Sequence, residues 1–355
     1  MITISLCMIV KNEEDVLERC LKSITPVVDE IIIVDTGSTD TTKDIALRYT
    51  PHVFDFPWVD DFSKARNFAF SKATQQYCMW VDADDILTPS DQTRLKTLKD
   101  TSDPTVDIFM LKYDIAFDEE DHPIFSYYRE RIIKNNGSFF WEGVVHEAIT
   151  PRGIIEYKEI AIQHRKLRPS NSDRNLRILE KQPQLSPREQ YYYGRELYYH
   201  KRYEDAIHVF NRFLNEKQGW IENNIDACKI RGLCYQKLGF IEEELNSYLQ
   251  SLSFDIPRGE LCCAIGNHFF QKQQYRQAIY WYQNATTLEI DETSGAFIEK
   301  DYYDFIPYLQ LCVCFDKLGD KESAKNYNDL AAFLKPNHPS VVHNKKYFQE
   351  NETSI

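Results

Sequence analysis

Three aspartates that follow a hydrophobic run are the residues of this sequence with the clearest chemical use. Asp82, Asp84 and Asp85 come directly after residues 78–81, which are apolar. Carboxylates packed together at the end of a buried strand repel one another, and a divalent cation removes that repulsion. Mg²⁺ and Mn²⁺ prefer oxygen ligands and keep open positions for substrate phosphates. The motif therefore predicts a Mg²⁺ or Mn²⁺ site beside a diphosphate, with a solvated acidic turn as the alternative.

Two further clusters place polar groups where a ligand is expected. Asp35 follows residues 31–34, a β-branched run, and α/β sheets bind ligands at the carboxyl ends of such strands. A plain turn capped by Ser38 is the alternative. Arg66 lies near the start of a predicted helix, where its guanidinium can bind a phosphate through two hydrogen bonds. A surface salt bridge is the alternative for Arg66.

A fourth cluster contains the groups that suit proton transfer. Trp141, His146 and Glu147 lie on one short segment that also contains a glycine. Glu147 is the predicted general base and His146 a predicted polar contact to a sugar. Asp114 and Asp118 are rival bases, and an ordinary edge strand is the alternative for the whole segment.

The elements that must position these clusters alternate between strands and helices. Short β-rich runs at residues 2–10, 30–34 and 77–81 are separated by helical patterns at residues 13–23, 39–49 and 61–73. Strands that alternate with helices in this way indicate a parallel sheet. Residues 107–162 turn to β-type segments, so the expected fold class is α/β, a Rossmann-like domain with a mixed sheet.

From residue 189 onward the pattern is helical and contains an internal repeat. The first position of the repeat is occupied by Gly194, Gly232, Gly266 and Cys312, at intervals of 38, 34 and 46 residues. A second position follows each of them by twelve residues, at Ala206, Glu244, Ala278 and Ala324. Small residues at these points let antiparallel helices approach closely, and Glu244 and Cys312 depart from this pattern. The pattern resembles the tetratricopeptide repeat of about 34 residues, with an unrelated helical bundle as the alternative.

In order and spacing, the clusters of residues 2–165 resemble family 2 glycosyltransferases of the GT-A fold. The segments that carry the resemblance are Lys11-Asn12-Glu13-Glu14, Asp35, Asp61 to Asn67, Asp82 to Asp84 and Val145-His146-Glu147. The resemblance implies inverting sugar transfer from a nucleoside diphosphate sugar such as UDP-glucose or UDP-GlcNAc, with Asp84 and His164 on the metal and Glu147 as base. It implies donor contacts from the following residues: Val10, Asn12, Glu14, Asp35, Arg66, Asp82, Ala83, Trp141 and His146. The acidic residue that many members place on a later helix has no counterpart here.

The layout of a GT-A domain followed by helical hairpins is similar to that of bacterial peptide S-glycosyltransferases that modify glycocins. This similarity implies a peptide or protein acceptor, modified on Cys, Ser or Thr and bound by the helical repeats. Two alternatives stay open: a glycan or lipid-linked saccharide acceptor in envelope polysaccharide synthesis, and a non-catalytic peptide-binding scaffold. A homodimer is also left open.

The length of 355 residues indicates two domains. We expect a glycosyltransferase domain at residues 1–165, a linker at 166–188, a helical repeat domain at 189–340 and a tail at 341–355. These boundaries follow the change from an alternating to a helical pattern.

Charge and cysteine usage limit the partners and the compartment. The formal net charge of −13 repels phosphate backbones, which argues against nucleic acid as a partner. The nine cysteines contain no CxxC pair, which fits a reducing cytoplasm. No apolar stretch reaches the length of about 18 residues that a membrane span needs.

Overall fold

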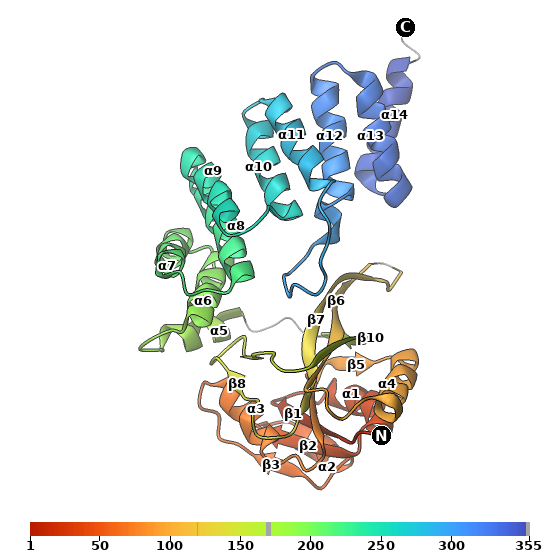
Figure 1. Cartoon of the computed structure of the whole chain (residues 1–355), viewed down its shortest axis with the longest axis vertical. Coiled ribbons are helices and arrows are strands. Elements are labelled where there is room, and N and C mark those ends of the chain that lie inside the picture. The colour runs from red at the N-terminus through yellow and green to blue at the C-terminus, as the bar shows by residue number, and fades with distance from the viewer. Residues whose placement is uncertain (119, 168–171, 353–355) are drawn as a thin grey trace. The chain divides into compact units, whose positions relative to one another are not determined.

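The computed structural model describes residues 1–118, 120–167 and 172–352 (Figure 1). The chain divides into two compact units, the first comprising Met1–Tyr193 with Glu292–Ala296 and the second comprising Gly194–Asp291 with Phe297–Ile355. Residues 168–171 of the expected linker and 353–355 of the expected tail lie outside the described residues. The described part of that linker contains helix α5 (Ser172–Glu180), and residues 341–352 continue helix α14 (Pro339–Glu352).

The first unit is built on a mixed sheet that has eight strands among the described residues, in the order β3-β2-β1-β4-β7-β6-β10-β5. These strands are β1 (Ile4–Val10), β2 (Glu30–Asp35), β3 (Val53–Asp55), β4 (Tyr77–Trp80), β5 (Asp85–Leu87), β6 (Ile108–Phe117), β7 (Pro123–Lys134) and β10 (Ile155–His164). Strands β1 to β4 pair in parallel, and β7 runs antiparallel to both β4 and β6. The expected α/β domain with a mixed sheet is thereby confirmed.

The register of the parallel strands brings the predicted site segments to one edge. Val10 lies opposite Asp35, and Cys7 lies opposite Trp80. Because β1 continues three residues beyond Cys7, its end lies level with the chain that follows β4. The ends of β1 and β2 and the aspartate motif after β4 therefore meet at the carboxyl edge of the sheet.

Helices cover this sheet because each has an apolar face. They are α1 (Leu17–Ile24), α2 (Thr42–Leu47), α3 (Phe62–Phe70) and α4 (Pro89–Thr101). Helix α1 buries Leu17, Cys20, Leu21 and Ile24 in the main core, together with the apolar side chains of β1. A small second sheet pairs β8 (Trp141–Glu142) with β9 (Ala148–Ile149).

Two differences from the sequence-based elements have local causes. Helix α1 starts at Leu17 instead of residue 13, because residues 13–16 form a turn in which the backbone N–H of Leu17 donates to the carbonyl of Glu13. Helix α4 was not predicted, although its sequence carries a start signal. Its first turn has Pro89 at the first helical position, and the backbone N–H of Asp91 donates to Thr88 Oγ1.

The helical region consists of hairpins of consecutive helices. They pair α8 (Ile221–Leu238) with α9 (Ile241–Gln250), α10 (Gly259–Gln271) with α11 (Tyr275–Ala285) and α12 (Phe305–Lys317) with α13 (Lys321–Leu334). Helix α6 (Pro187–Tyr199) is followed in the chain by α7 (Tyr203–Glu216). The repeat glycines lie under aromatic rings of the second helix: a Cβ on Gly194, Gly232 or Gly266 would lie 2.6, 2.2 or 2.7 Å from the rings of Phe210, Tyr248 and Tyr282. The tetratricopeptide-like region is therefore confirmed as helical hairpins with close contacts at the predicted small residues. No helix among the described residues is long and apolar enough to cross a membrane.

Gly232→Ala is expected to destabilise the helical unit. The added methyl group would meet the ring of Tyr248, which is fully buried and has no room to move. Overpacking of this kind costs about 1–3 kcal/mol, of which the better helix propensity of alanine returns about 1 kcal/mol. Thermal unfolding followed by circular dichroism should show a lower midpoint. Asn246→Ala, an exposed change on α9, is the control, and an unchanged midpoint for Gly232→Ala would contradict the close contact.

Candidate active site

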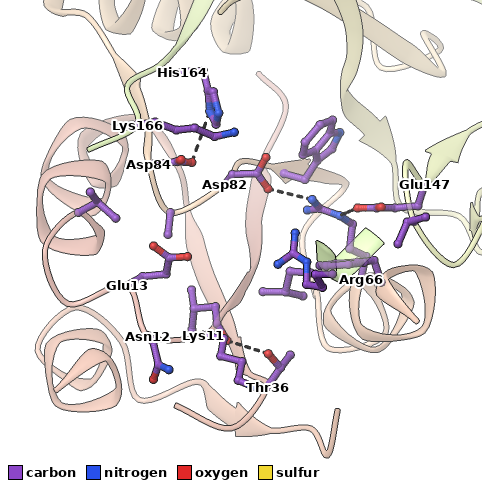
Figure 2. A pocket seen from close by; sticks show the side chains of 18 of the residues that line it. Lys11, Asn12, Glu13, Thr36, Arg66, Asp82, Asp84, Glu147, His164 and Lys166 are labelled. Carbon is purple, nitrogen blue, oxygen red and sulfur yellow. Dashed lines mark hydrogen bonds and ion pairs between the residues drawn. The ribbon is translucent and has the colours of Figure 1, made fainter. Parts of the chain in front are cut away.

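A cavity of about 590 Å³ opens at the carboxyl edge of β1, β2 and β4, and all of its lining residues belong to the first unit (Figure 2). It brings together nine of the twelve predicted site residues: Val10, Asn12, Arg66, Asp82, Ala83, Asp84, His146, Glu147 and His164. The structure places the other three, Glu14, Asp35 and Trp141, outside its lining.

Glu14 faces the start of α2 instead of the cavity. Its Oε2 accepts hydrogen bonds from the backbone N–H of Thr41 at 3.1 Å and from Thr41 Oγ1 at 2.7 Å. The preceding residue, Glu13, lines the cavity in its place. The expectation of a donor contact from Glu14 is thus corrected, because the turn before α1 directs neighbouring side chains to opposite sides.

Asp35 lies buried at the end of β2, next to Thr36, which lines the cavity. Its Oδ1 accepts from the backbone N–H groups of Gly37 and Ser38, both at 2.8 Å. Its Oδ2 is buried and has no hydrogen-bond partner among the described residues. A buried carboxylate oxygen without a donor is costly, so this oxygen can accept a hydrogen bond from a bound ligand.

Asn12 connects the loops that follow β1 and β2. Its backbone is left-handed, with φ of 56°, a conformation that asparagine tolerates better than most residues. Its Oδ1 accepts from the backbone N–H of Thr39 at 2.8 Å, and its own N–H donates to Ser38 Oγ at 2.9 Å. The two loops at this end of the cavity are therefore tied together.

Arg66 forms the buried centre of the opposite wall. Its Nε donates to Glu147 Oε1 at 2.5 Å and its Nη2 donates to Asp82 Oδ1 at 2.8 Å (Figure 2). The guanidinium lies 4.8 Å from the ring centroids of both Trp80 and Trp141. Trp141, predicted as a donor contact, thus packs behind Arg66. The expectation that Arg66 binds a phosphate through two hydrogen bonds is corrected as well. Its Nε and Nη2 already donate to carboxylates, and among the described residues only its Nη1 lacks a partner.

The charges around Arg66 set the state of Asp82. Burial alone would raise the pKa of Asp82, but the positive charges of Arg66 and Arg131 outweigh burial and hold that pKa below its ordinary value. Asp82 is therefore an anion at neutral pH. Glu147 keeps only Oε2 for a proton, since Oε1 accepts from Arg66.

Asp84 and His164 lie at the other end of the cavity beside Asp85. Ligand atoms of these three residues lie within 4.8 Å of one another. Burial raises the pKa of Asp84, and the negative charges of Asp82 and Asp85 raise it further. Burial lowers the pKa of His164, but its hydrogen bond to Asp85 and the nearby carboxylates outweigh burial and raise it. Oxygen and imidazole donors under such repulsion suit a divalent cation, so these residues fit Mg²⁺ or Mn²⁺.

The rival bases do not reach the cavity. Asp118 caps a turn between β6 and β7, where its Oδ1 accepts from the backbone N–H groups of Glu120 and His122. Asp114 is buried on β6, and burial raises the pKa of its carboxyl group. Of the three carboxylates considered as bases, Glu147 is the one that lines the cavity.

Sequence reasoning missed several cavity residues. Lys11 and Lys166 both line the cavity, and Figure 2 shows Lys166 on the side of Asp84 and His164. Tyr113 and Arg129 also line it, from β6 and β7. A lysine two positions after a predicted metal-binding histidine was the available signal for Lys166. No local pattern pointed to Tyr113 or Arg129, because their approach depends on strand pairing.

Comparisons with known proteins agree with this geometry. Residues 5–155 match the sequence profile of glycosyl transferase family 2. The chain is 43% identical over 100 residues to a TPR repeat-containing protein of Synechococcus elongatus, covering 28% of this chain and 25% of that protein. It is 27% identical over 284 residues to the SPbeta prophage-derived glycosyltransferase SunS of Bacillus subtilis, covering 72% of this chain and 64% of that protein. It therefore spans less than two thirds of either relative.

Among solved structures, glucosyl-3-phosphoglycerate synthase from Mycobacterium tuberculosis in complex with Mg²⁺ and uridine diphosphate is similar to 32% of this chain. The identity is 25%, the similarity covers 44% of that chain and the TM-score is 0.28. The family match spans β1 to the start of β10, and it includes the aspartate motif, Arg66 and Glu147. The chain therefore carries a glycosyl transferase family 2 domain, followed by a tetratricopeptide-like helical region.

Proposed function

We propose that this chain transfers a sugar from a UDP-sugar, UDP-glucose or UDP-GlcNAc, to a Cys, Ser or Thr side chain of a peptide or protein, with inversion at the anomeric carbon. One observation carries the proposal. A single cavity combines the cation ligands Asp84 and His164 with Asp82, Glu147 and Lys166. Acidic residues for a metal, a lysine for a phosphate and a carboxylate for an acceptor proton are the groups that such a transfer needs.

Each end of the cavity has a role in binding the donor. Oδ2 of Asp35 accepts a hydrogen bond from the imide N–H of uracil, which supplies the donor that this oxygen lacks. Val10, Asn12 and Thr36 line the adjacent wall, where the nucleoside is placed. Asp82, Ala83 and His146 contact the ribose or the sugar. Asp84 and His164 would hold Mg²⁺ or Mn²⁺, which would supply positive charge for the departing diphosphate.

Lys166 adds a positive charge at the same end. The side chain is exposed and lines the cavity. A cation at this place attracts the diphosphate and stabilises the negative charge that grows on it during transfer. Lys11, at the other end of the cavity, strengthens the attraction for an anionic donor.

Glu147 acts on the acceptor. Arg66 fixes its carboxylate through Oε1, and Oε2 removes the proton from the acceptor hydroxyl or thiol. Because the same guanidinium also binds Asp82, the base and the sugar contact are held at a constant separation. Inversion follows if the acceptor at Glu147 attacks the anomeric carbon from the face opposite the departing diphosphate, which leaves as the new bond forms.

A peptide or protein acceptor is supported by the helical region. Helical hairpins present long surfaces that suit extended peptides. The sequence similarity to SunS runs over 284 residues, which is longer than the family domain alone. The free, buried state of all nine cysteines suits a reducing compartment, and we place the protein in the cytoplasm on that ground.

The test is mass spectrometry of candidate peptides incubated with the full chain, Mn²⁺ and a panel of nucleotide sugars. We expect peptides to gain one hexose or N-acetylhexosamine from a UDP-sugar, and Cys→Ser peptides to show which atom accepts the sugar. The chain should also hydrolyse the donor slowly without an acceptor. Transfer to saccharides but not peptides would replace the acceptor assignment, and failure to bind or hydrolyse any nucleotide sugar would indicate a scaffold instead of an enzyme.

A further inference from the structure

The proposed base lies on a short loop whose backbone has an uncommon conformation. The loop connects β8 to β9 and carries Val145, His146 and Glu147. His146 has a left-handed backbone with φ of 52°, and its side chain is exposed. A left-handed residue other than glycine costs free energy and persists only where surrounding contacts hold it in place. The groups that contact this loop therefore decide where Glu147 lies.

Two of these contacts come from helix α3, which lies within the family match. The backbone N–H of Phe62 donates to the carbonyl of Val144 at 2.9 Å. One helical turn further along α3, Arg66 binds the carboxylate of Glu147. These contacts act at Val144 and Glu147, on either side of His146 in the sequence.

Further contacts come from the start of α6, which belongs to the first unit as far as Tyr193 and lies beyond the family match. Ser186 and Glu189 form a capping box there. The backbone N–H of Glu189 donates to Ser186 Oγ at 3.3 Å, and the backbone N–H of Ser186 donates to Glu189 Oε2 at 2.8 Å. Glu189 Oε1 accepts from the backbone N–H of Val144 at 3.0 Å. The residue that starts the helix therefore also holds the loop.

His146 itself is contacted by Arg188 and Tyr192 of α6. Arg188 Nε donates to the carbonyl of His146 at 3.0 Å. The Tyr192 ring stacks on the imidazole, with centroids 4.1 Å apart and planes inclined by 11°. Tyr192 is only 7% exposed, and the Arg188 guanidinium lies 4.9 Å from the centroid of its ring. Residues four apart share one face of a helix, so a single face of α6 contacts both the backbone and the ring of the left-handed residue.

We propose that Arg188, Glu189 and Tyr192 are positioning residues for the sugar transfer: they hold His146 in its left-handed conformation and thereby place Glu147 at the acceptor. The inference rests on the proposed function, because it assigns supporting residues to the same site. It extends the active-site support beyond the family match, into the segment that leads to the helical repeats. A chain that ended at residue 165 would lack all three residues.

The test is turnover of UDP-glucose and UDP-GlcNAc by the full chain with Mn²⁺, in which water takes the place of the acceptor. Tyr192→Phe keeps the stacked ring, whereas Tyr192→Leu removes it. A misplacement of about 1 Å can cost about 100-fold in rate, so we expect Tyr192→Leu to lower kcat by about 10–100-fold and Tyr192→Phe to keep most of it. UDP affinity should stay unchanged in both, since neither change touches the groups proposed to bind UDP. Tyr199→Leu, an exposed change on the same helix, is the matched control.

Hydrogen exchange of the backbone amides at residues 144–147 provides a readout that does not depend on turnover. These amides should exchange faster in Tyr192→Leu than in the wild type, and also in Arg188→Ala, whose half-buried side chain we expect to be replaced without loss of folding. Unchanged exchange in both variants would overturn the inference, as would an unchanged kcat in Tyr192→Leu or a loss of kcat matched by an equal loss of UDP affinity. If the wild type turns over no nucleotide sugar, the proposed function fails, and the exchange rates still decide whether α6 holds the loop.

Discussion

Asp84→Ala is expected to abolish Mn²⁺-dependent hydrolysis of the UDP-sugar, with a loss of at least about 1,000-fold in turnover. A bound cation contributes several kcal/mol to stabilising the leaving diphosphate, and each 1.36 kcal/mol corresponds to a factor of ten in rate. The pKa of Asp84 is raised by burial and by Asp82 and Asp85, which shows that its charge is unfavourable in the folded chain without a cation. Removing that charge should therefore leave the thermal midpoint of the metal-free protein unchanged or higher.

The measurement is release of UDP with and without Mn²⁺, combined with thermal unfolding of the metal-free protein. Asp100→Ala is a matched control, because Asp100 is an exposed aspartate on α4 outside the cavity lining. Full turnover in Asp84→Ala would refute its assignment as a metal ligand. Loss of turnover together with loss of the folded state would show a structural role instead.

Arg66→Met is expected to have the largest effect on stability. It removes the cation between Asp82 and Glu147, and the Arg66 and Glu147 side chains are only 8% and 10% exposed. Removing one partner of a buried ion pair typically costs about 3–5 kcal/mol, because the carboxylate left behind has no counter-charge. Glu147 would stay buried in this way, whereas the Asp82 side chain is 35% exposed and would lose less. Urea unfolding should show this loss, and turnover should fall too, since both carboxylates lose their fixed positions.

The pH dependence of unfolding provides a check on the cause. The pKa of Asp82 is lowered in the folded chain, so its ion pair contributes stability above the pKa of an unfolded aspartate, about 3.9, and loses that contribution as the pH falls below this value. The free energy of unfolding of the wild type should fall in that acidic range, whereas the Arg66→Met curve should be flatter there. Parallel curves would show that packing against Trp80 and Trp141, and not charge, explains the lost stability.

The sequence was sufficient to predict the edge of the sheet at which the site forms. Each of β1, β2 and β4 is a hydrophobic run that ends in polar residues, and parallel strands bring such ends together. This rule was enough to predict Asp35 and the aspartate motif at one edge of the sheet, whereas Val10 and Ala83 were implied by the family resemblance. The positions of the repeat glycines could also be predicted from the sequence, because the requirement for a small residue recurs with the period of the hairpins.

Contacts between distant segments could not be predicted in the same way. The partners of Arg66 lie 16 and 81 residues away in the sequence, so its enclosure by two carboxylates depends on the full fold. The contact between Asp85 and His164 depends on β5 pairing with β10, which brings the two residues together across 79 positions of the sequence. The choice between Glu13 and Glu14 depended on the direction of side chains in a single irregular turn, for which the sequence has no periodic signal.

The hydrogen bonds of Asn12 have a consequence for how donor specificity can change. Since Asn12 ties the loops after β1 and β2 to each other, their conformational entropy is lost during folding and not again when the nucleotide binds. The end of the cavity that we propose for the nucleoside is therefore ordered before any ligand binds. Changes in the transferred sugar are then expected to come from the segment between β8 and β9, which contains His146. Replacing that short segment would be a route to a new donor.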